Sequence, residues 1–198
     1  MFTKVNVWCK LVYIHQKGDV KMRNKTKQMI YAALLIALAI IIPVIFSGIK
    51  VIIGPFTATP ASHLPMFVAM MISPMVAIVV GIGSTIGFLL TGTIMPVVFR
   101  AATHILVGYV GALIIKKKKN YKLATIVTAP IHGLAEALVV IPFVGFDLYY
   151  LIVITCIGTI AHHLFDSVLS YAVIKSVSRA RRCNIYDTFG EFNNAAEI

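Results

Sequence analysis

Residues 51–99 read VIIGPFTATPASHLPMFVAMMISPMVAIVVGIGSTIGFLLTGTIMPVVF, and they contain no Asp, Glu, Lys or Arg. A helix that crosses a bilayer needs about 20 apolar residues to cover roughly 30 Å of hydrocarbon. This run is long enough for two such helices, and residues 28–49 form another uncharged run. A soluble helix would show a polar face at helical spacing, and neither run shows one.

The composition agrees with a membrane protein. The 198 residues are 59% apolar and 13% charged, whereas soluble domains have about 45–50% and about 25%. We therefore predict an all-α polytopic membrane protein, a bundle of six transmembrane helices. The expected spans cover residues 28–46, 62–73, 74–90, 96–115, 121–141 and 148–175.

The basic residues predict the orientation of the bundle. The segment before the first span, the loop between the fourth and fifth spans and the C-terminal segment hold seven, five and four of the 18 Lys and Arg residues. Positive charge collects in cytoplasmic loops, so both termini are expected in the cytoplasm. The net charge of +11 is placed as this topology demands and does not indicate nucleic acid.

The chain divides into three parts. Residues 1–21 are expected to be a non-native or disordered extension, because Met22 opens a more typical start, MRNKTK, before the first span. Residues 22–175 form the transmembrane domain, and residues 176–198 are expected to be a disordered cytoplasmic tail. The loop over residues 50–65 contains Pro55, Pro60 and Pro65, so it either lies outside the membrane or folds back as a lid.

Small residues recur four apart in three spans: Ala33 with Ala37, Gly83 with Gly87, and Gly108 with Ala112. This spacing lets helix backbones approach closely in lipid. For the second and third pairs we expect packing within the chain. The first helix of a small bundle can lie at its edge, so Ala33 and Ala37, with Ala32 and Ala39 on the same surface, are candidates for a partner-facing site.

Ionisable side chains inside spans are costly and by default mark a functional site. They are Arg100 and His104 in the fourth span, His132 and Glu136 in the fifth, and His162, His163 and Asp166 in the sixth. A rise of about 1.5 Å per residue puts the first four within roughly 14 Å of the outer ends of their helices, where they could form one outward-open cluster. His162 and His163 lie deeper, and Asp166 is a weaker candidate. The alternative is that these groups pair with each other only to hold the helices together.

Catalysis is the rival interpretation. An intramembrane metal-dependent hydrolase would use such residues, but HExxH is absent, His132 and Glu136 are spaced as HxxxE, and Arg100 would repel a cation. No GxxxxGK[ST] loop is present either, so the chain is not expected to hydrolyse ATP. We expect no catalytic residue, no metal and no cofactor, and a binding subunit whose ATP-driven motor lies in other chains.

Four stretches carry a family resemblance: ASHLPMFVAMMISPMVA, FRAATHILVGYVGALI, HGLAEALVV and GTIAHHLFD. With the six spans, the Ala33–Ala37 pattern and the Pro/Thr-rich first loop, residues 22–175 resemble the substrate-binding S-components of energy-coupling-factor (ECF) vitamin transporters. The stretches are most similar to the niacin-specific S-components. The resemblance implies a multi-pass protein of the bacterial plasma membrane with a vitamin pocket near the outer face, built by spans 4 to 6 and capped by the first loop. It also implies docking through the first span onto a transmembrane coupling subunit that carries two ATPases.

Niacin suits the candidate residues chemically, although another small carboxylate-bearing vitamin would also fit. Arg100 could fork onto the carboxylate of nicotinate, and His104 or His132 could hydrogen-bond the carboxylate or ring nitrogen. Glu136 could orient Arg100 or a histidine, and Phe56, Tyr149 and Tyr150 could cover the ring. The expected substrate-binding residues are Arg100, His104, His132, Glu136, His162, His163, Tyr149 and Phe56.

Overall fold

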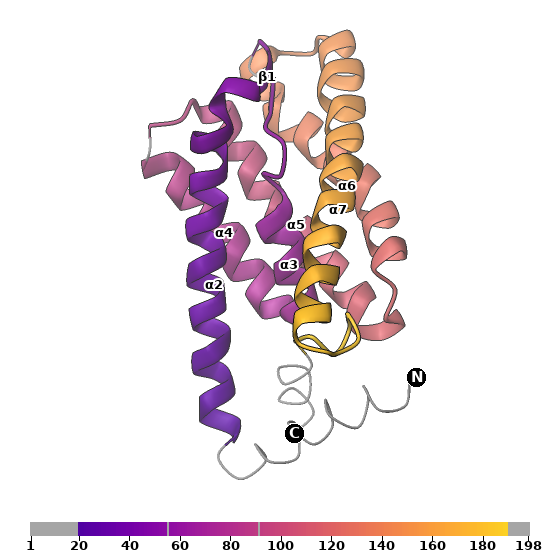
Figure 1. The fold of residues 1–198 in the computed structure, drawn as a ribbon. Coiled ribbons are helices and arrows are strands. Elements are labelled where there is room, and N and C mark those ends of the chain that lie inside the picture. Colours follow the sequence, from indigo (N-terminus) through magenta and orange to yellow (C-terminus); the bar gives the residue numbers. More distant parts are fainter. Residues whose placement is uncertain (1–19, 55, 91, 190–198) are drawn as a thin grey trace.

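The structure is a computed structural model that describes residues 20–54, 56–90 and 92–189. It is a bundle of long helices interrupted by one small β-hairpin (Figure 1). The elements are α2 (Val20–Ile45), η1 (Phe46–Ile49), β1 (Val51–Ile53), β2 (Phe56–Ala58), α3 (Leu64–Ile72), α4 (Pro74–Leu90), α5 (Met95–Lys118), α6 (Tyr121–Val144), η2 (Tyr150–Ile157) and α7 (Gly158–Ala180).

Four helices in the described ranges are long and apolar enough to cross a membrane: Lys25–Ile49, Met95–Lys118, Tyr121–Val144 and Tyr150–Ala180. Large apolar side chains such as Leu34, Ile86 and Leu138 are exposed on the outside of the bundle, as a protein surrounded by lipid requires. The chain is therefore a multi-pass helical membrane protein. Pro74–Leu90 is shorter, and α3 has only nine residues, so the full count of six spans stays a prediction.

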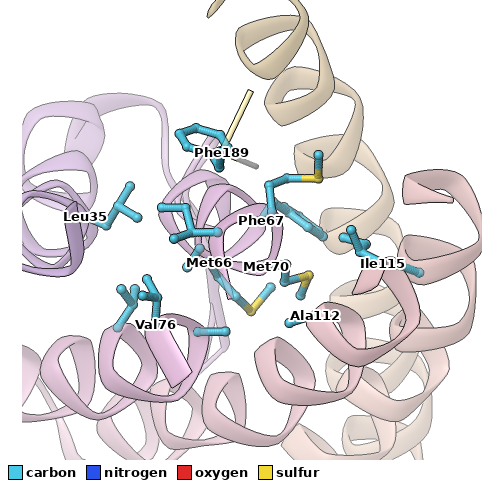
Figure 2. Close-up of a cluster of buried hydrophobic side chains, with 14 of the residues drawn as sticks. Leu35, Met66, Phe67, Met70, Val76, Ala112, Ile115 and Phe189 are labelled. Carbon is cyan, nitrogen blue, oxygen red and sulfur yellow. The ribbon is translucent and has the colours of Figure 1, made fainter. Parts of the chain in front are cut away.

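The short helix α3 forms the centre of the packing. Pro65 stands in its first turn and extended Ser73 ends it, directly before Pro74 opens α4. Nearly all of its side chains are buried, and Figure 2 shows Met66, Phe67 and Met70 among residues from α2, α4 and α5. A helix apolar all round is stable only when it is enclosed, and the longer helices enclose α3.

Glycines set the distance between α2 and α4. A Cβ on Gly83 would lie 2.4 Å from Cδ1 of Ile36, and a Cβ on Gly87 would lie 2.3 Å from Cδ1 of Ile40. These glycines therefore receive the isoleucines of α2, which confirms the expected packing within the chain. Gly108 of α5 likewise packs against Ala77 of α4, because a Cβ there would meet the Ala77 methyl at 3.3 Å.

The alanines of α2 divide between two faces. Ala32 and Ala39 are buried together with Leu35, so they do not widen an outer surface as the sequence suggested. Ala33 and Ala37 are exposed on the opposite face. Spacings of three and four residues place each group on its own side of the helix.

The loop before α3 folds back into the bundle. β1 and β2 pair antiparallel, with Val51 opposite Ala58, a hairpin that an all-α prediction did not include. Beyond β2 the chain descends between the helices and reaches the middle of the bundle before α3 begins (Figure 1). Of the two alternatives for this loop, the structure shows the inward one.

The C-terminal part differs from the expected disorder. α7 continues to Ala180, and Phe189 is 5% exposed and packs edge-on against Tyr31 of α2. The buried aromatic contact holds the segment that follows α7, from residue 181 to 189, against α2. The predicted extension over residues 1–21 lies outside the described residues except for the first two residues of α2, and residues 190–198 also lie outside them.

Candidate functional site

A cavity of about 630 Å³ opens at the end of the bundle that lies away from Lys116–Lys119. Its walls come mainly from α2, the hairpin loop, α4 and α5, and only Glu136 and His162 reach it from α6 and α7. This differs from the pocket between spans 4 to 6 that the resemblance implied. The difference arises because the loop packs against the face of α6 and α7 and leaves the open space on the side of α2 and α4.

An ion pair lies at the inner wall of this cavity. Arg100 of α5 donates from Nε to Oε2 of Glu136 on α6 at 2.8 Å, and from Nη2 to the carbonyl oxygen of Thr57 at 3.1 Å. Both charged side chains are buried. The third guanidinium nitrogen, Nη1, is buried without a hydrogen-bond partner among the described residues. Two nitrogens therefore fix the guanidinium, and the remaining one keeps an unused donor beside the cavity that Arg100 lines.

Phe56 of β2 covers this arginine. The guanidinium carbon of Arg100 lies 4.5 Å from the ring centroid of Phe56, which is 4% exposed. Gly158 at the start of α7 makes room for the ring, because a Cβ there would lie 3.1 Å from Cζ of Phe56. The stacking is a cation–π contact, and it holds the planar guanidinium in one orientation.

Five histidines gather beside the ion pair. The His104 and His132 ring centroids are 5.1 Å apart, and those of His132 and His163 are 5.2 Å apart. His63, from the loop, lies 5.0 Å from His104, 4.9 Å from His132 and 4.5 Å from His162. Four histidines predicted from three spans are thus brought together around a fifth, His63, that the prediction did not include.

Asp166 joins the loop to α7. Its carboxylate accepts from the backbone amides of Ala61 at 2.7 Å and His63 at 3.0 Å, and from Nδ1 of His63 at 2.9 Å. His162, one turn earlier, donates from Nε2 to the carbonyl oxygen of Thr59 at 2.9 Å. A fully buried carboxylate needs such donors, so Asp166 holds the loop in place and does not line the cavity.

The structure separates the predicted site residues into groups. Arg100, His104, Glu136 and His162 line the cavity. Phe56 contacts Arg100, His132 contacts Glu136, and Nδ1 of His163 lies 3.0 Å from Nδ1 of His132. Tyr149 is 67% exposed and does not line the cavity. Its neighbour Tyr150 instead donates its hydroxyl to the carbonyl oxygen of Ile53 at 3.3 Å.

Sequence reasoning missed three residues of this site: His63, Thr57 and Thr159. The Thr159 hydroxyl donates to Oε2 of Glu136, the same oxygen that accepts from Arg100. His63 was the one signal available, because a histidine in an uncharged stretch between two prolines is unusual for a membrane loop. Its contacts could not be inferred, because they depend on the loop folding inward to Asp166 of α7.

Comparison with known proteins places the chain in a family. Over 191 aligned residues it is 31% identical to the niacin transporter NiaX of Lactococcus lactis subsp. cremoris. The alignment covers 89% of this chain and 86% of that protein. No protein-family profile matches the chain, and no solved structure matches it. Proteins of this kind are substrate-binding subunits and not enzymes. The buried polar cluster behind an open cavity and the similarity over nearly the whole length agree, and the chain belongs to the S-components of energy-coupling-factor vitamin transporters, in the group of this niacin transporter.

Proposed function

We propose that this chain captures niacin from outside the cell for an ATP-driven ECF transporter. The observation that carries the proposal is Arg100, a buried guanidinium on the cavity wall with one nitrogen unpartnered. A carboxylate is the ligand that such a nitrogen recognises best. The niacin specificity is supported by the name of the relative from Lactococcus lactis.

The cavity suits a small aromatic acid. Its volume of about 630 Å³ falls within the range of roughly 300–1,000 Å³ that small-molecule sites occupy. The nicotinate carboxylate would accept from Nη1 of Arg100, whose other nitrogens are already held by Glu136 and Thr57. Because the guanidinium is fixed before the ligand arrives, little ordering entropy opposes binding. His104 and His162, which also line the cavity, are the candidate partners for the pyridine nitrogen.

The topology proposed for this function is six passes with both termini in the cytoplasm of a bacterium. Basic residues such as Lys27, Lys122 and Arg179 lie at one end of the bundle, and the cavity opens at the other, as the concentration of positive charge on the cytoplasmic side requires. α3 covers only about 14 Å at 1.5 Å per residue. The inward loop completes this pass, because its polar backbone is enclosed by protein and does not face lipid.

The proposed partners are a transmembrane coupling subunit and two ATPases. α2 packs against α3 and α4 only on its inner side, and Ala33 and Ala37 lie on its exposed side. Small residues at this spacing allow a partner helix to approach closely. The Ala33–Ala37 face is therefore the proposed docking site.

Calorimetric titration of nicotinate into the detergent-purified protein tests the ligand. Arg100→Ala is expected to abolish binding, but it also leaves Glu136 as an unpaired buried carboxylate, which destabilises by about 3–5 kcal/mol. The double variant Arg100→Ala with Glu136→Gln removes that charge, and Arg179→Ala, at an exposed position far from the cavity, is the control for loss of one positive charge. Affinity close to that of the unmodified protein in the folded double variant would refute the assignment of Arg100.

Mass spectrometry of small molecules that co-purify with the protein separates niacin from other vitamins. Nicotinate or nicotinamide supports the proposal. A different carboxylate-bearing vitamin would keep the transporter class and replace the ligand, and co-purification of an ATPase would support the coupling partners.

A further inference from the structure

A chain of buried hydrogen bonds on α6 and α7 supports one arrangement of the protons on two histidines. The Thr128 hydroxyl donates to the carbonyl oxygen of Ala124 at 2.8 Å. With the Thr128 proton on Ala124, the Thr128 oxygen accepts from Nε2 of His163, at 3.1 Å. A neutral imidazole carries one proton, so Nδ1 of His163 is an acceptor.

The same arrangement extends to His132. Its Nδ1 lies 3.0 Å from Nδ1 of His163; in this arrangement it donates to His163, and Nε2 of His132 presents a lone pair. That Nε2 lies 3.2 Å from Oε1 of Glu136 and makes no hydrogen bond. Two acceptors thus face each other where His132 is 0% and Glu136 2% exposed. Buried polar atoms without partners are costly, and a cation between the two would satisfy both.

Two further ring nitrogens, from His63 and His104, lie near the same point. His63 directs Nδ1 to Asp166 at 2.9 Å, which leaves its Nε2 as an acceptor. No hydrogen bond to the His104 ring is present within residues 20–54, 56–90 and 92–189, and His104 lies 5.0 Å from His63 between ring centroids. One ligand atom from each of His63, His104, His132 and Glu136 lies within 4.8 Å of every other.

We propose that His63, His104, His132 and Glu136 bind one divalent transition-metal cation of the Zn²⁺ type. Three imidazoles and one carboxylate form a ligand set that Zn²⁺ accepts in tetrahedral geometry. With bonds of about 2.0–2.1 Å, the ligand atoms of such a site lie about 3.3 Å apart, so atoms that are up to 4.8 Å apart here need to draw together by at most about 1.5 Å. The sequence analysis considered a metal at these residues and set it aside, because His132 and Glu136 lack HExxH spacing and Arg100 would repel a cation. His63, which comes from the loop, was not among its candidates.

The groups behind the ligands support a metal. Metal-bound histidines commonly donate their other ring nitrogen to a carboxylate or another acceptor, which orients the ring. His63 does so to Asp166, and His132 does so to His163. Both interactions hold the lone pairs of the two Nε2 atoms toward the same space.

Arg100 is the charge that opposes this site. Its guanidinium, however, bonds to Oε2 of Glu136, whereas Oε1 faces His132. Asp166 adds a second carboxylate behind His63, so two negative groups balance one guanidinium and part of the cation charge. Three of the ligands, His63, His104 and Glu136, line the open cavity, which provides a path for the ion to enter.

Cobalt titration tests the proposal without any vitamin. The protein is purified through an affinity tag that contains no histidine, stripped with a chelator and titrated with Co²⁺, whose visible absorption reports tetrahedral coordination. We expect saturation at one Co²⁺ per chain, displacement by Zn²⁺, and one zinc per chain by elemental analysis after zinc reloading and desalting.

Two variants locate the ion. His104→Ala removes no hydrogen bond within the described residues and is expected to weaken Co²⁺ binding by at least about a hundredfold, since losing even an outer partner of a metal ligand costs 10- to 100-fold. His162→Gln can still donate to Thr59 and lies outside the four ligands, so it is expected to bind Co²⁺ as the unmodified protein does. Thermal unfolding of both variants shows whether each is folded.

The outcomes distinguish this proposal from the vitamin function. Absence of tetrahedral Co²⁺ absorption, or unchanged binding in folded His104→Ala, overturns the metal site, and a proton then satisfies His132 and Glu136. Loss of binding in folded His162→Gln also overturns the assigned ligand set. Nicotinate titration of the metal-free protein is scored separately, so the metal site and the vitamin function can fail independently.

Discussion

The carboxylate of Asp166 offers a quantitative test of how the loop is held in the bundle. It accepts hydrogen bonds from the amides of Ala61 and His63 and from the His63 ring, at 2.7–3.0 Å. Ala61 has a φ of 65°, a left-handed conformation that costs an alanine about 1–2 kcal/mol. The loop is thus strained locally, and Asp166 is the group that maintains the strained conformation.

Asp166→Ala removes these three hydrogen bonds and also the 3.2 Å contact between Oδ2 of Asp166 and Nε2 of His162. Hydrogen bonds to an ionised group contribute about 1.5–3 kcal/mol each, which gives an additive ceiling of roughly 4.5–9 kcal/mol. Bonds within one network are not additive, and release of the Ala61 strain favours detachment of the loop. We therefore expect the free energy that docks the loop to fall by about 3–5 kcal/mol, which is a factor of more than about 100 in the population of the open loop.

Hydrogen exchange measured by mass spectrometry in detergent reads this population directly. Peptides that contain residues 59–63 are expected to exchange at least about a hundredfold faster in Asp166→Ala. Asp166→Asn keeps one acceptor oxygen and is expected to lie between the two. Asp147→Ala is the matched control, because Asp147 accepts from the amide of Tyr150 at 3.0 Å at an exposed position and its loss should leave residues 59–63 unaffected.

Two results would refute this reasoning. Exchange of residues 59–63 within about threefold of the unmodified protein would mean that other contacts hold the loop. Equal acceleration in α4 and α5 would mean that Asp166 stabilises the whole bundle, because loop anchoring predicts a change confined to the loop and its immediate neighbours.

Further predictions concern packing, the ligand and the partner. Gly133→Ala would place a Cβ 2.6 Å from the carbonyl oxygen of Cys156, so thermal unfolding should show a loss of about 1–3 kcal/mol in stability. Gly48→Ala is the control, because a Cβ there has nothing within 4 Å and should leave stability unchanged. Equal effects of the two substitutions would mean that close packing at Gly133 is not the cause. Phe56→Ala should weaken nicotinate binding, measured by calorimetry, at least about tenfold, because Arg100 loses its stacking partner. Tyr149→Ala should change the affinity less than twofold. A larger effect for Tyr149 than for Phe56 would contradict the role given to Phe56. Ala33→Trp should leave the unfolding temperature unchanged but prevent co-purification with the coupling subunit, and retained co-purification would exclude this face as the docking site.

The contacts of the polar cluster divide into those that helix spacing predicts and those that it does not. His132 and Glu136 lie one turn apart on one helix, so their proximity could be read from the sequence, and the pairing of Arg100 with Glu136 was one expected alternative. Tyr149 shows the limit of such reasoning. It stands one residue from Tyr150, whose hydroxyl contacts the hairpin, yet Tyr149 itself points outward, because side-chain direction in the π-helical turn that begins there depends on local backbone geometry.

The C-terminal segment shows a second limit. Its polar composition predicted disorder, but Phe189 packs against Tyr31, and the amide of Tyr121 donates to the Tyr186 hydroxyl at 3.1 Å. A few aromatic side chains are enough to order a short segment when a complementary surface is present. That surface exists only once α2, α3 and α6 are assembled.

The sequence by itself determined the class of protein and the family, and it predicts the direction of the chain in the membrane. These depend on hydropathy, on the placement of Lys and Arg and on similarity, all of which are properties of single residues summed along the chain. The tertiary structure alone decided that the first loop enters the bundle, that the cavity opens between α2, α4 and α5, and that His63 joins the histidines of three helices. The physical reason is that one buried carboxylate, Asp166, binds two amides and a ring of a loop more than 100 residues away, and no local pattern in a sequence encodes such a long-range contact.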